Sequence, residues 1–170
     1  TSSTINQLSI GDALAVATLN KKKIKKKDFK NFHPSGSLGA QLKTVKDLML
    51  TQKKIPFINQ NSKMSNALKV IGKKKLGTLV VMNDKKLTTG IITDGQIRRI
   101  SQKNKKFQDL KVKDVMTKNP ISVNQEMLAH KALSLMNENK ITILCVNKNN
   151  KNNKTIGIIH IHNILENNIK

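Results

Sequence analysis

The feature that most constrains the fold of this 170-residue chain is an internal repeat. Three segments occur twice, at an offset of 65 or 67 positions: VKDLM at 45–49 and VKDVM at 112–116, LGTLVV at 76–81 and ITILCV at 141–146, and GII at 90–92 and 157–159. A repeat of this length is large enough to be a small domain. Because each copy needs a partner to bury its apolar surface, the duplication predicts two copies that share a buried surface.

Each copy is predicted to contain a short strand, a helix, two strands joined by a polar turn, and a last helix. Apolar residues at helical spacing indicate helices at about 65–75 and 128–139. Short β-branched runs indicate the strand pairs 78–82 with 87–93 and 142–146 with 155–159, and the last helices are expected to begin at Asp94 and His162. Trp and Tyr are absent, so the core must be aliphatic. The predicted fold class is therefore α/β.

A formal net charge of +22 raises the question of a nucleic-acid partner, because clustered cations release counterions from phosphates. The positive charge is almost entirely lysine scattered over the surface segments, and only Arg98 and Arg99 offer planar guanidinium groups. No Trp or Tyr is present to stack on bases. A solvated lysine surface therefore explains the charge better, and we expect no nucleic-acid partner.

Cysteine usage and hydropathy indicate where the chain works. The single cysteine, Cys145, lies inside an apolar run and is interpreted as a small buried residue. With one cysteine there is no disulfide framework, which is typical of a reducing compartment. No apolar run is long enough to span a bilayer and no signal peptide is evident. We expect a cytoplasmic protein with no membrane partner.

The first 43 residues differ from the repeats. Hydroxyl residues precede an apolar stripe over 1–20, which predicts a helix, and we expect the upstream part of its domain to be missing. The basic segment 21–32 then leads to the sequence HPSGSLGA at 33–40. Pro34 restricts His33 to an extended conformation, and a rigidly held histidine can act as a general acid or base near neutral pH. An ordinary histidine in a surface loop is the alternative.

These motifs together resemble known families. The sequence GIITDGQIRR, preceded by LGTLVV and VKDLM, resembles a CBS domain, and two copies in tandem resemble a CBS pair, or Bateman module. The segment TSSTINQLSIGDALAVATL with HPSGSLGAQL resembles the end of a sugar isomerase (SIS) domain. This order is similar to the bacterial D-arabinose-5-phosphate isomerase family. The resemblance implies an SIS remnant at 1–43, a first CBS domain at 44–103 and a second at 111–170.

The isomerase resemblance implies an aldose–ketose isomerisation of D-ribulose 5-phosphate and D-arabinose 5-phosphate, which supplies Kdo for lipopolysaccharide. The reaction proceeds through an enediol and needs a base that moves a proton between two carbons. By resemblance, His33 is the catalytic residue of the family that this chain retains. Since the sugar-phosphate loops lie upstream in that family, we expect a mainly regulatory piece that is inactive alone. The resemblance implies no cofactor and no metal site.

The CBS resemblance also implies a ligand cleft between the repeats. In ligand-binding CBS domains a Thr or Ser precedes an Asp by three residues and binds phosphate and ribose, but here Gln96 follows Thr93, and His160 with Asn163 replace the second pair. We therefore expect no tight binding of adenosine nucleotides. A sugar phosphate or nucleotide sugar is the expected ligand, and the candidate ligand-binding residues are Asn61, Thr93, Arg98 and Asp114.

Two alternatives remain open at this point. Asp114 can instead cap local backbone and Arg98 can simply be solvated. The chain as a whole can instead be a stand-alone CBS-pair module that binds a small anionic metabolite without catalysis. In either reading we expect a homo-oligomer, a dimer or a tetramer.

Overall fold

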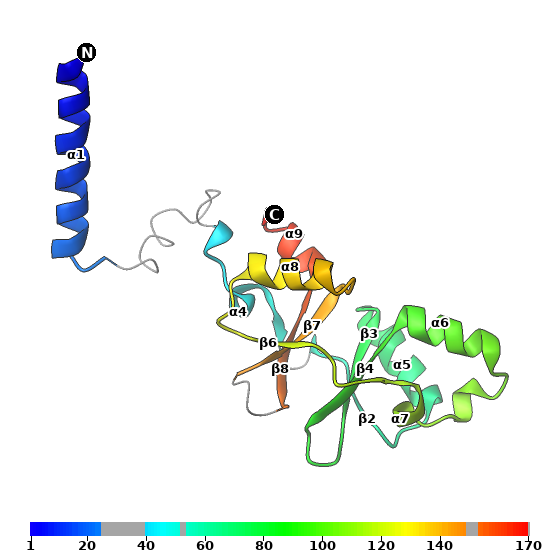
Figure 1. Cartoon of the computed structure of the whole chain (residues 1–170). Coiled ribbons are helices and arrows are strands. Elements are labelled where there is room, and N and C mark those ends of the chain that lie inside the picture. The colour runs from blue at the N-terminus through cyan, green and yellow to red at the C-terminus, as the bar shows by residue number, and fades with distance from the viewer. Residues whose placement is uncertain (25–39, 52–53, 149–152, 170) are drawn as a thin grey trace. The chain divides into compact units, whose positions relative to one another are not determined.

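The computed structural model describes residues 1–24, 40–51, 54–148 and 153–169, and the chain divides into two compact units, Thr1–Lys43 and Thr44–Lys170 (Figure 1). The described part of the first unit contains the helix α1 (Ser2–Lys21), which begins where Thr1 accepts a hydrogen bond from the backbone N–H of Thr4. The predicted helix is confirmed. None of its residues is buried, and Ile5, Leu8 and Leu14 are each about two-thirds exposed.

The second unit contains both repeats, and they have the same order of helices and strands, with one additional 3-10 turn at the end of the first. The first repeat consists of α4 (Val45–Leu48), β1 (Leu50–Thr51), β2 (Phe57–Asn59), α5 (Met64–Lys74), β3 (Thr78–Met82), β4 (Thr88–Thr93), α6 (Asp94–Lys103) and the 3-10 turn η2 (Phe107–Asp109). The second consists of α7 (Val112–Val115), β5 (Thr117–Lys118), β6 (Ser122–Asn124), α8 (Ala129–Glu138), β7 (Ile143–Asn147), β8 (Thr155–His160) and α9 (Ile161–Leu165). The predicted helices and strand pairs are confirmed to within one or two residues.

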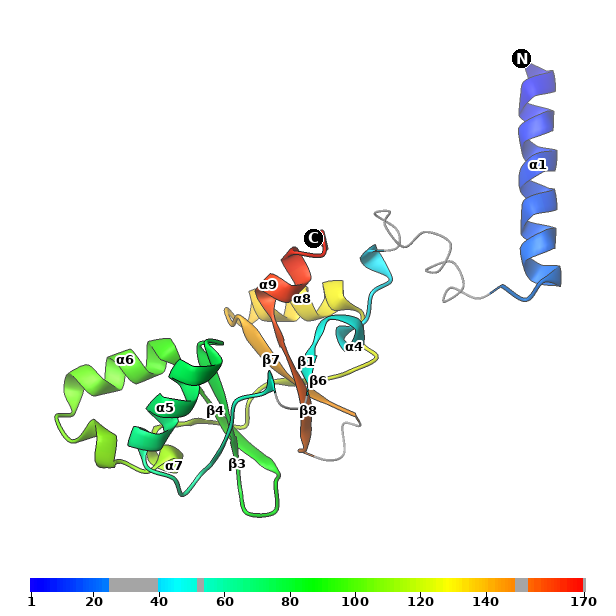
Figure 2. The same cartoon turned by 180° about the vertical axis from the view of Figure 1, so that it is seen from behind.

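Two four-stranded sheets form the centre of the second unit, with the orders β2-β3-β4-β5 and β1-β8-β7-β6. Each repeat gives its first short strand to the sheet of the other. The strand β1 pairs with β8, placing Leu50 opposite Ile158, and β5 pairs with β4, placing Thr117 opposite Ile91. The views in Figures 1 and 2 show both sheets with helices α5 and α6 on one and α8 and α9 on the other. The exchange of strands was not predicted from the sequence.

Both faces of the central strands are buried, which explains why the β-branched runs contain no polar alternation. In the first repeat Leu79, Val81 and Ile92 pack against helices in one cluster. Their neighbours Val80 and Ile91 face the other way and pack against Ile143, Cys145 and Ile158 of the second repeat. This second cluster joins the two sheets and confirms the predicted shared surface.

Contacts between equivalent residues show that an approximate twofold axis relates the repeats. Thr88 and Thr155 begin equivalent strands, and the buried Thr88 hydroxyl donates to the Thr155 hydroxyl at 2.7 Å. The backbone N–H of Val45 donates to Met127 of the second repeat at 2.8 Å, and that of Val112 donates to Ser62 of the first at 2.9 Å. A residue that contacts its own equivalent lies next to the axis, so the axis passes between β4 and β8.

Candidate ligand site

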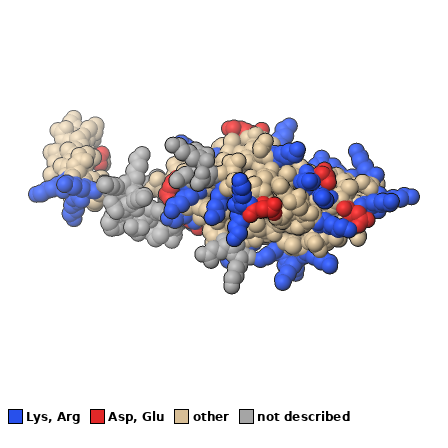
Figure 3. Space-filling view, turned by 90° about the horizontal axis from the view of Figure 1, so that it is seen from below, with Lys and Arg blue, Asp and Glu red and all other residues tan. Residues whose placement is uncertain are grey.

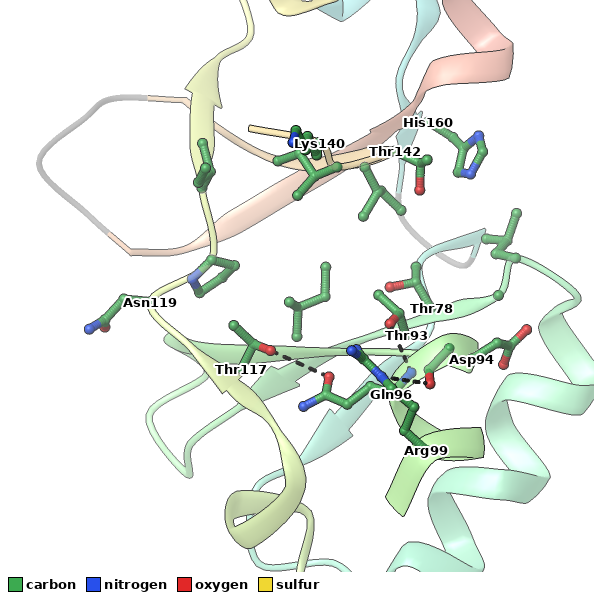
Figure 4. A pocket seen from close by; sticks show the side chains of 18 residues that line it. Thr78, Thr93, Asp94, Gln96, Arg99, Thr117, Asn119, Lys140, Thr142 and His160 are labelled. Atoms are coloured by element: carbon green, nitrogen blue, oxygen red, sulfur yellow. Dashed lines mark hydrogen bonds between the residues drawn. The ribbon is translucent and has the colours of Figure 1, made fainter. Parts of the chain in front are cut away.

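A cavity of about 580 Å³ lies between the two repeats within the second unit (Figure 4). Its apolar lining includes Leu76, Ile91, Ile121, Ile141 and Ile143. The polar lining consists of Thr78, Thr93, Asp94, Gln96 and Arg99 from the first repeat and Thr117, Asn119, Lys140, Thr142 and His160 from the second. This volume is typical of small-molecule sites, and a mostly apolar wall with a few convergent polar groups is their usual lining.

The cavity is built at the point where a strand ends and a helix begins in each repeat. Thr93 is the last residue of β4 and the N-cap of α6, where its hydroxyl accepts from the backbone N–H of Gln96 at 3.4 Å. His160 holds the equivalent place between β8 and α9, where Nδ1 accepts from the backbone N–H of His162 at 3.2 Å. The side chain of Asn163 completes that cap by accepting from the His160 N–H at 3.1 Å. Helix capping therefore accounts for Thr93, His160 and Asn163, three of the residues at the positions where ligand-binding CBS domains contact their ligand.

Gln96 joins the two repeats at the edge of the cavity. Its Nε2 donates to the carbonyl oxygen of Val115, and its Oε1 accepts from the Thr117 hydroxyl at 3.4 Å. Both partners belong to the second repeat, so the side chain connects α6 to the end of α7 and to the start of β5. Because the amide carries no charge and both ends are engaged, Gln96 is a poor acceptor for ligand hydroxyl groups.

Positive charge exceeds negative charge around the cavity. Figure 4 shows Arg99 extending from α6 towards the middle, while Lys140 and His160 approach from the opposite side. The Nε of Arg99 donates to the Gly95 carbonyl at 3.3 Å, which fixes the direction of the guanidinium. Asp94 is the one carboxylate among the described lining residues. Elsewhere lysine and arginine are spread over the face seen in Figure 3 without forming one patch.

His160 is neutral near neutral pH. Burial lowers the pKa of its imidazole below the ordinary 6.5, and the neighbouring His162 lowers it further. The two rings stack with their centroids 4.8 Å apart, so a positive charge on one ring disfavours protonation of the other. Since Nδ1 is the acceptor of the helix cap, the neutral ring carries its proton on Nε2 and can donate one hydrogen bond.

The structure separates the candidate residues named from the sequence. Thr93 lines the cavity, whereas Asn61, Arg98 and Asp114 are not among its lining residues. Asn61 lies between β2 and α5, Asp114 lies in α7, and Arg98 is exposed on α6 next to the lining residue Arg99. His33 lies outside the described residues. The ligand-binding and catalytic roles of these residues stay predictions.

Five polar residues of the lining were not among the candidate ligand-binding residues named from the sequence: Asp94, Arg99, Lys140, Thr142 and His160. The signal for two of them was available, because Lys140 and Thr142 flank the start of the run that repeats LGTLVV. Within the described part of the chain, no cluster of three or more His, Cys, Asp or Glu residues could hold a metal ion. None of the described helices is both long and apolar enough to cross a membrane.

Fold and site define the class of protein: a pair of α/β repeats with a cavity between them. Residues 45–103 and 112–169 each match the CBS domain, and the chain belongs to the CBS domain family. It is also similar to the arabinose 5-phosphate isomerase KdsD of Escherichia coli strain K12 and of Yersinia pestis, with 37% identity to each over 97% of this chain. The chain spans about half the length of these relatives, 50% in each case.

Solved structures support the fold. The crystal structure of CBSX2 in complex with AMP matches with a TM-score of 0.62 and 24% identity, covering 72% of this chain and 93% of that one. The CBS-domain containing protein ATU1752 from Agrobacterium tumefaciens matches with a TM-score of 0.67 and 19% identity, covering 76% and 96%. At these identities the likeness shows the tandem CBS fold alone.

Proposed function

We propose that this chain is the C-terminal, mainly regulatory part of an arabinose-5-phosphate isomerase. The observation that carries the proposal is the 37% identity to such isomerases, which extends over 97% of this chain and so includes residues outside the CBS matches. In this proposal residues 1–43 are the tail of a sugar isomerase domain and His33 belongs to its active site. The reaction interconverts D-ribulose 5-phosphate and D-arabinose 5-phosphate for Kdo and lipopolysaccharide synthesis in the cytoplasm.

The CBS pair supplies regulation by binding a small anionic ligand in the cavity between the repeats. Arg99 and Lys140 outnumber the single described carboxylate of the lining, and His160 adds a neutral donor. The net positive potential favours an anion, and the apolar wall excludes water from around it. A sugar phosphate or a nucleotide sugar meets both requirements. An effector bound here would contact both repeats, so its binding would change how firmly they are held together.

A chimera tests the isomerase assignment. The half of the E. coli relative that matches this chain is replaced by residues 1–170, and turnover of D-arabinose 5-phosphate is measured. We expect activity in the chimera, its loss on His33→Ala, and no turnover by residues 1–170 alone, because proton transfer needs a substrate held in near-attack geometry. A folded chimera that is inactive, or substantial turnover by residues 1–170 alone, would contradict the assignment.

Calorimetry on residues 1–170 tests the binding function separately, with D-arabinose 5-phosphate, CMP-Kdo, AMP and ATP as probes. We expect one of the first two to bind and AMP and ATP to bind weakly. Failure of all four probes would refute the ligand-binding proposal. An inactive chimera combined with ligand binding would favour the second candidate function, a stand-alone sensor, because the cavity is formed entirely by residues of the CBS pair.

A further inference from the structure

We infer that the cavity selects a sugar monophosphate over an adenosine nucleotide, with the phosphate on Arg99 and Lys140 and adjacent sugar hydroxyl groups on Asp94. The inference rests on the proposed ligand-binding function and adds the chemistry of the ligand and the residues that discriminate it. In ligand-binding CBS domains the carboxylate that binds hydroxyl groups stands at the position of Gln96. In this chain we assign that role to Asp94 instead.

Most of the neutral polar side chains that the first repeat contributes to the cavity already form hydrogen bonds within the protein. The Thr78 hydroxyl donates to the Ile92 carbonyl at 3.1 Å, and the Thr93 oxygen accepts from the α6 backbone. Gln96 uses both ends of its amide on the second repeat. A ligand on this side of the cavity therefore meets the side chains of Asp94 and Arg99 as its principal polar partners.

Asp94 has the properties of a hydroxyl acceptor. It is the first residue of α6 and lines the cavity, and no hydrogen bond or ion pair engages its carboxylate among the described residues. Its Oδ2 lies 3.2 Å from the point that a Cβ on Gly77 would occupy, and Gly77 has a φ of +63°. The glycine thus lets the backbone pass close to the carboxylate. A carboxylate accepts from two neighbouring hydroxyl groups at once, and such charge-assisted bonds are the strong ones.

Arg99 and Lys140 provide the anion-binding side from the two different repeats. The bond from Arg99 Nε to the Gly95 carbonyl leaves the terminal N–H groups of the guanidinium directed into the cavity (Figure 4). No ion pair joins Asp94 to Arg99 or to Lys140 in the described part of the chain, so neither cation is neutralised by that carboxylate. Guanidinium and ammonium groups both bind phosphate, the former in bidentate geometry.

The second repeat cannot duplicate the hydroxyl side of the site, because Ile161 stands where the first repeat has Asp94. The described lining also contains no aromatic side chain other than the imidazole of His160, so little in the cavity would recognise a base by stacking. Phosphate and hydroxyl groups therefore decide affinity. Because the cation Lys140 and the carboxylate Asp94 come from different repeats, one ligand bridges both and the stoichiometry is one per chain.

The test compares two sugar phosphates that differ in one hydroxyl group. D-arabinose 5-phosphate and 2-deoxy-D-ribose 5-phosphate are titrated into residues 1–170 by calorimetry, with D-arabinose and inorganic phosphate as the partial ligands. We expect the deoxy sugar to bind about 10- to 100-fold more weakly, the loss of one charge-assisted hydrogen bond. Asp94→Asn should bind the two sugar phosphates equally. Arg99→Ala and Lys140→Ala should each weaken both by about tenfold or more, while the matched control Arg98→Ala should change neither.

The outcomes separate the inference from the function on which it rests. Equal affinity for the two sugar phosphates in the wild type, or discrimination that survives Asp94→Asn, overturns the inference and leaves a ligand-binding CBS pair in place. An effect of Arg98→Ala as large as that of Arg99→Ala also overturns it. Binding of none of the sugar phosphates, CMP-Kdo, AMP or ATP refutes the proposed ligand-binding function itself. Circular dichroism of each variant confirms that it is folded.

Discussion

Replacing Gly90 with alanine should weaken the strand that the second repeat gives to the first. A Cβ at Gly90 would lie 2.5 Å from Met116 Sδ, 2.8 Å from Met116 Cγ and 2.9 Å from the carbonyl oxygen of Thr117. The methionine can move, but Thr117 is paired with Ile91 in the β4–β5 ladder. Overpacking a close contact costs about 1–3 kcal/mol, and because backbone is involved we expect about 2–3 kcal/mol here.

The equivalent glycine of the second repeat provides an internal comparison. A Cβ at Gly157 would lie 2.5 Å from Met49 Sδ but 3.2 Å from the carbonyl oxygen of Leu50. The backbone is thus farther away and the flexible methionine carries most of the clash. We expect Gly157→Ala to cost about 1–2 kcal/mol, less than Gly90→Ala. Adding Met49→Ala should relieve most of the clash at Gly157, whereas Met116→Ala should relieve the clash at Gly90 only in part.

Urea unfolding followed by far-ultraviolet circular dichroism measures these free energies, because the chain has no Trp or Tyr for fluorescence. The control is Gly72→Ala in α5, where nothing lies within 4 Å of the added Cβ. That change should stabilise the protein by about 0.5–1 kcal/mol through helix propensity. Wild-type stability in Gly90→Ala, or a larger loss in Gly157→Ala than in Gly90→Ala, would refute the reasoning about the exchanged strands.

Three further predictions follow from single groups. Thr88→Val should lower the free energy of urea unfolding by about 1–3 kcal/mol, because it removes the hydrogen-bonding partner of the Thr155 hydroxyl and backbone N–H. The double variant Thr88→Val with Thr155→Val should lose less stability than the sum of the two single variants, and strict additivity would contradict this. Burial raises the pKa of the Cys145 thiol to about 11, so a thiol reagent should modify it only when the protein opens, and rapid labelling of the folded protein would contradict this. Burial lowers the pKa of His160, so its neutral form is favoured by folding; that stability is complete above the ordinary pKa of 6.5 and declines as the pH falls below it. His160→Asn keeps a capping acceptor and should show a smaller loss of stability on acidification, whereas an unchanged loss would contradict this.

The fold could be predicted from the sequence because its main signal is a repeat. The runs 78–82 and 142–146 were identified as strands since both of their faces are buried and few polar residues interrupt them. The exchange of β1 and β5 was not predicted. A two-residue strand has no periodicity of its own, and its partner is chosen by how the two repeats pack. Sequence periodicity describes a strand or a helix, but it does not say which neighbour pairs with it.

The choice between Arg98 and Arg99 shows why the site was harder to predict. Successive residues of a helix are about 100° apart. Ile97 and Ile100 pack against the core, so the apolar direction lies between them, and Arg98 and Arg99 then lie at about 130° on either side of it. The helix alone gives both arginines the same relation to the core. Only the position of the second repeat, which closes the cavity over one side of α6, places Arg99 in the lining.

The polar groups of the cavity come from both repeats, and this has a thermodynamic consequence. A ligand that contacts Arg99 and Asp94 on one side and Lys140 on the other binds only when the repeats are packed together. Binding to the folded state alone adds RT ln(1 + [L]/Kd) to the free energy of unfolding, about 2.7 kcal/mol at a hundredfold excess over Kd. That amount is comparable to the expected cost of Gly90→Ala, which weakens the packing of the same two repeats. Under the proposed function, ligand occupancy and the exchanged strands would therefore act on one equilibrium, the association of the repeats. The ligand would be sensed through that equilibrium without any change in the fold of either repeat.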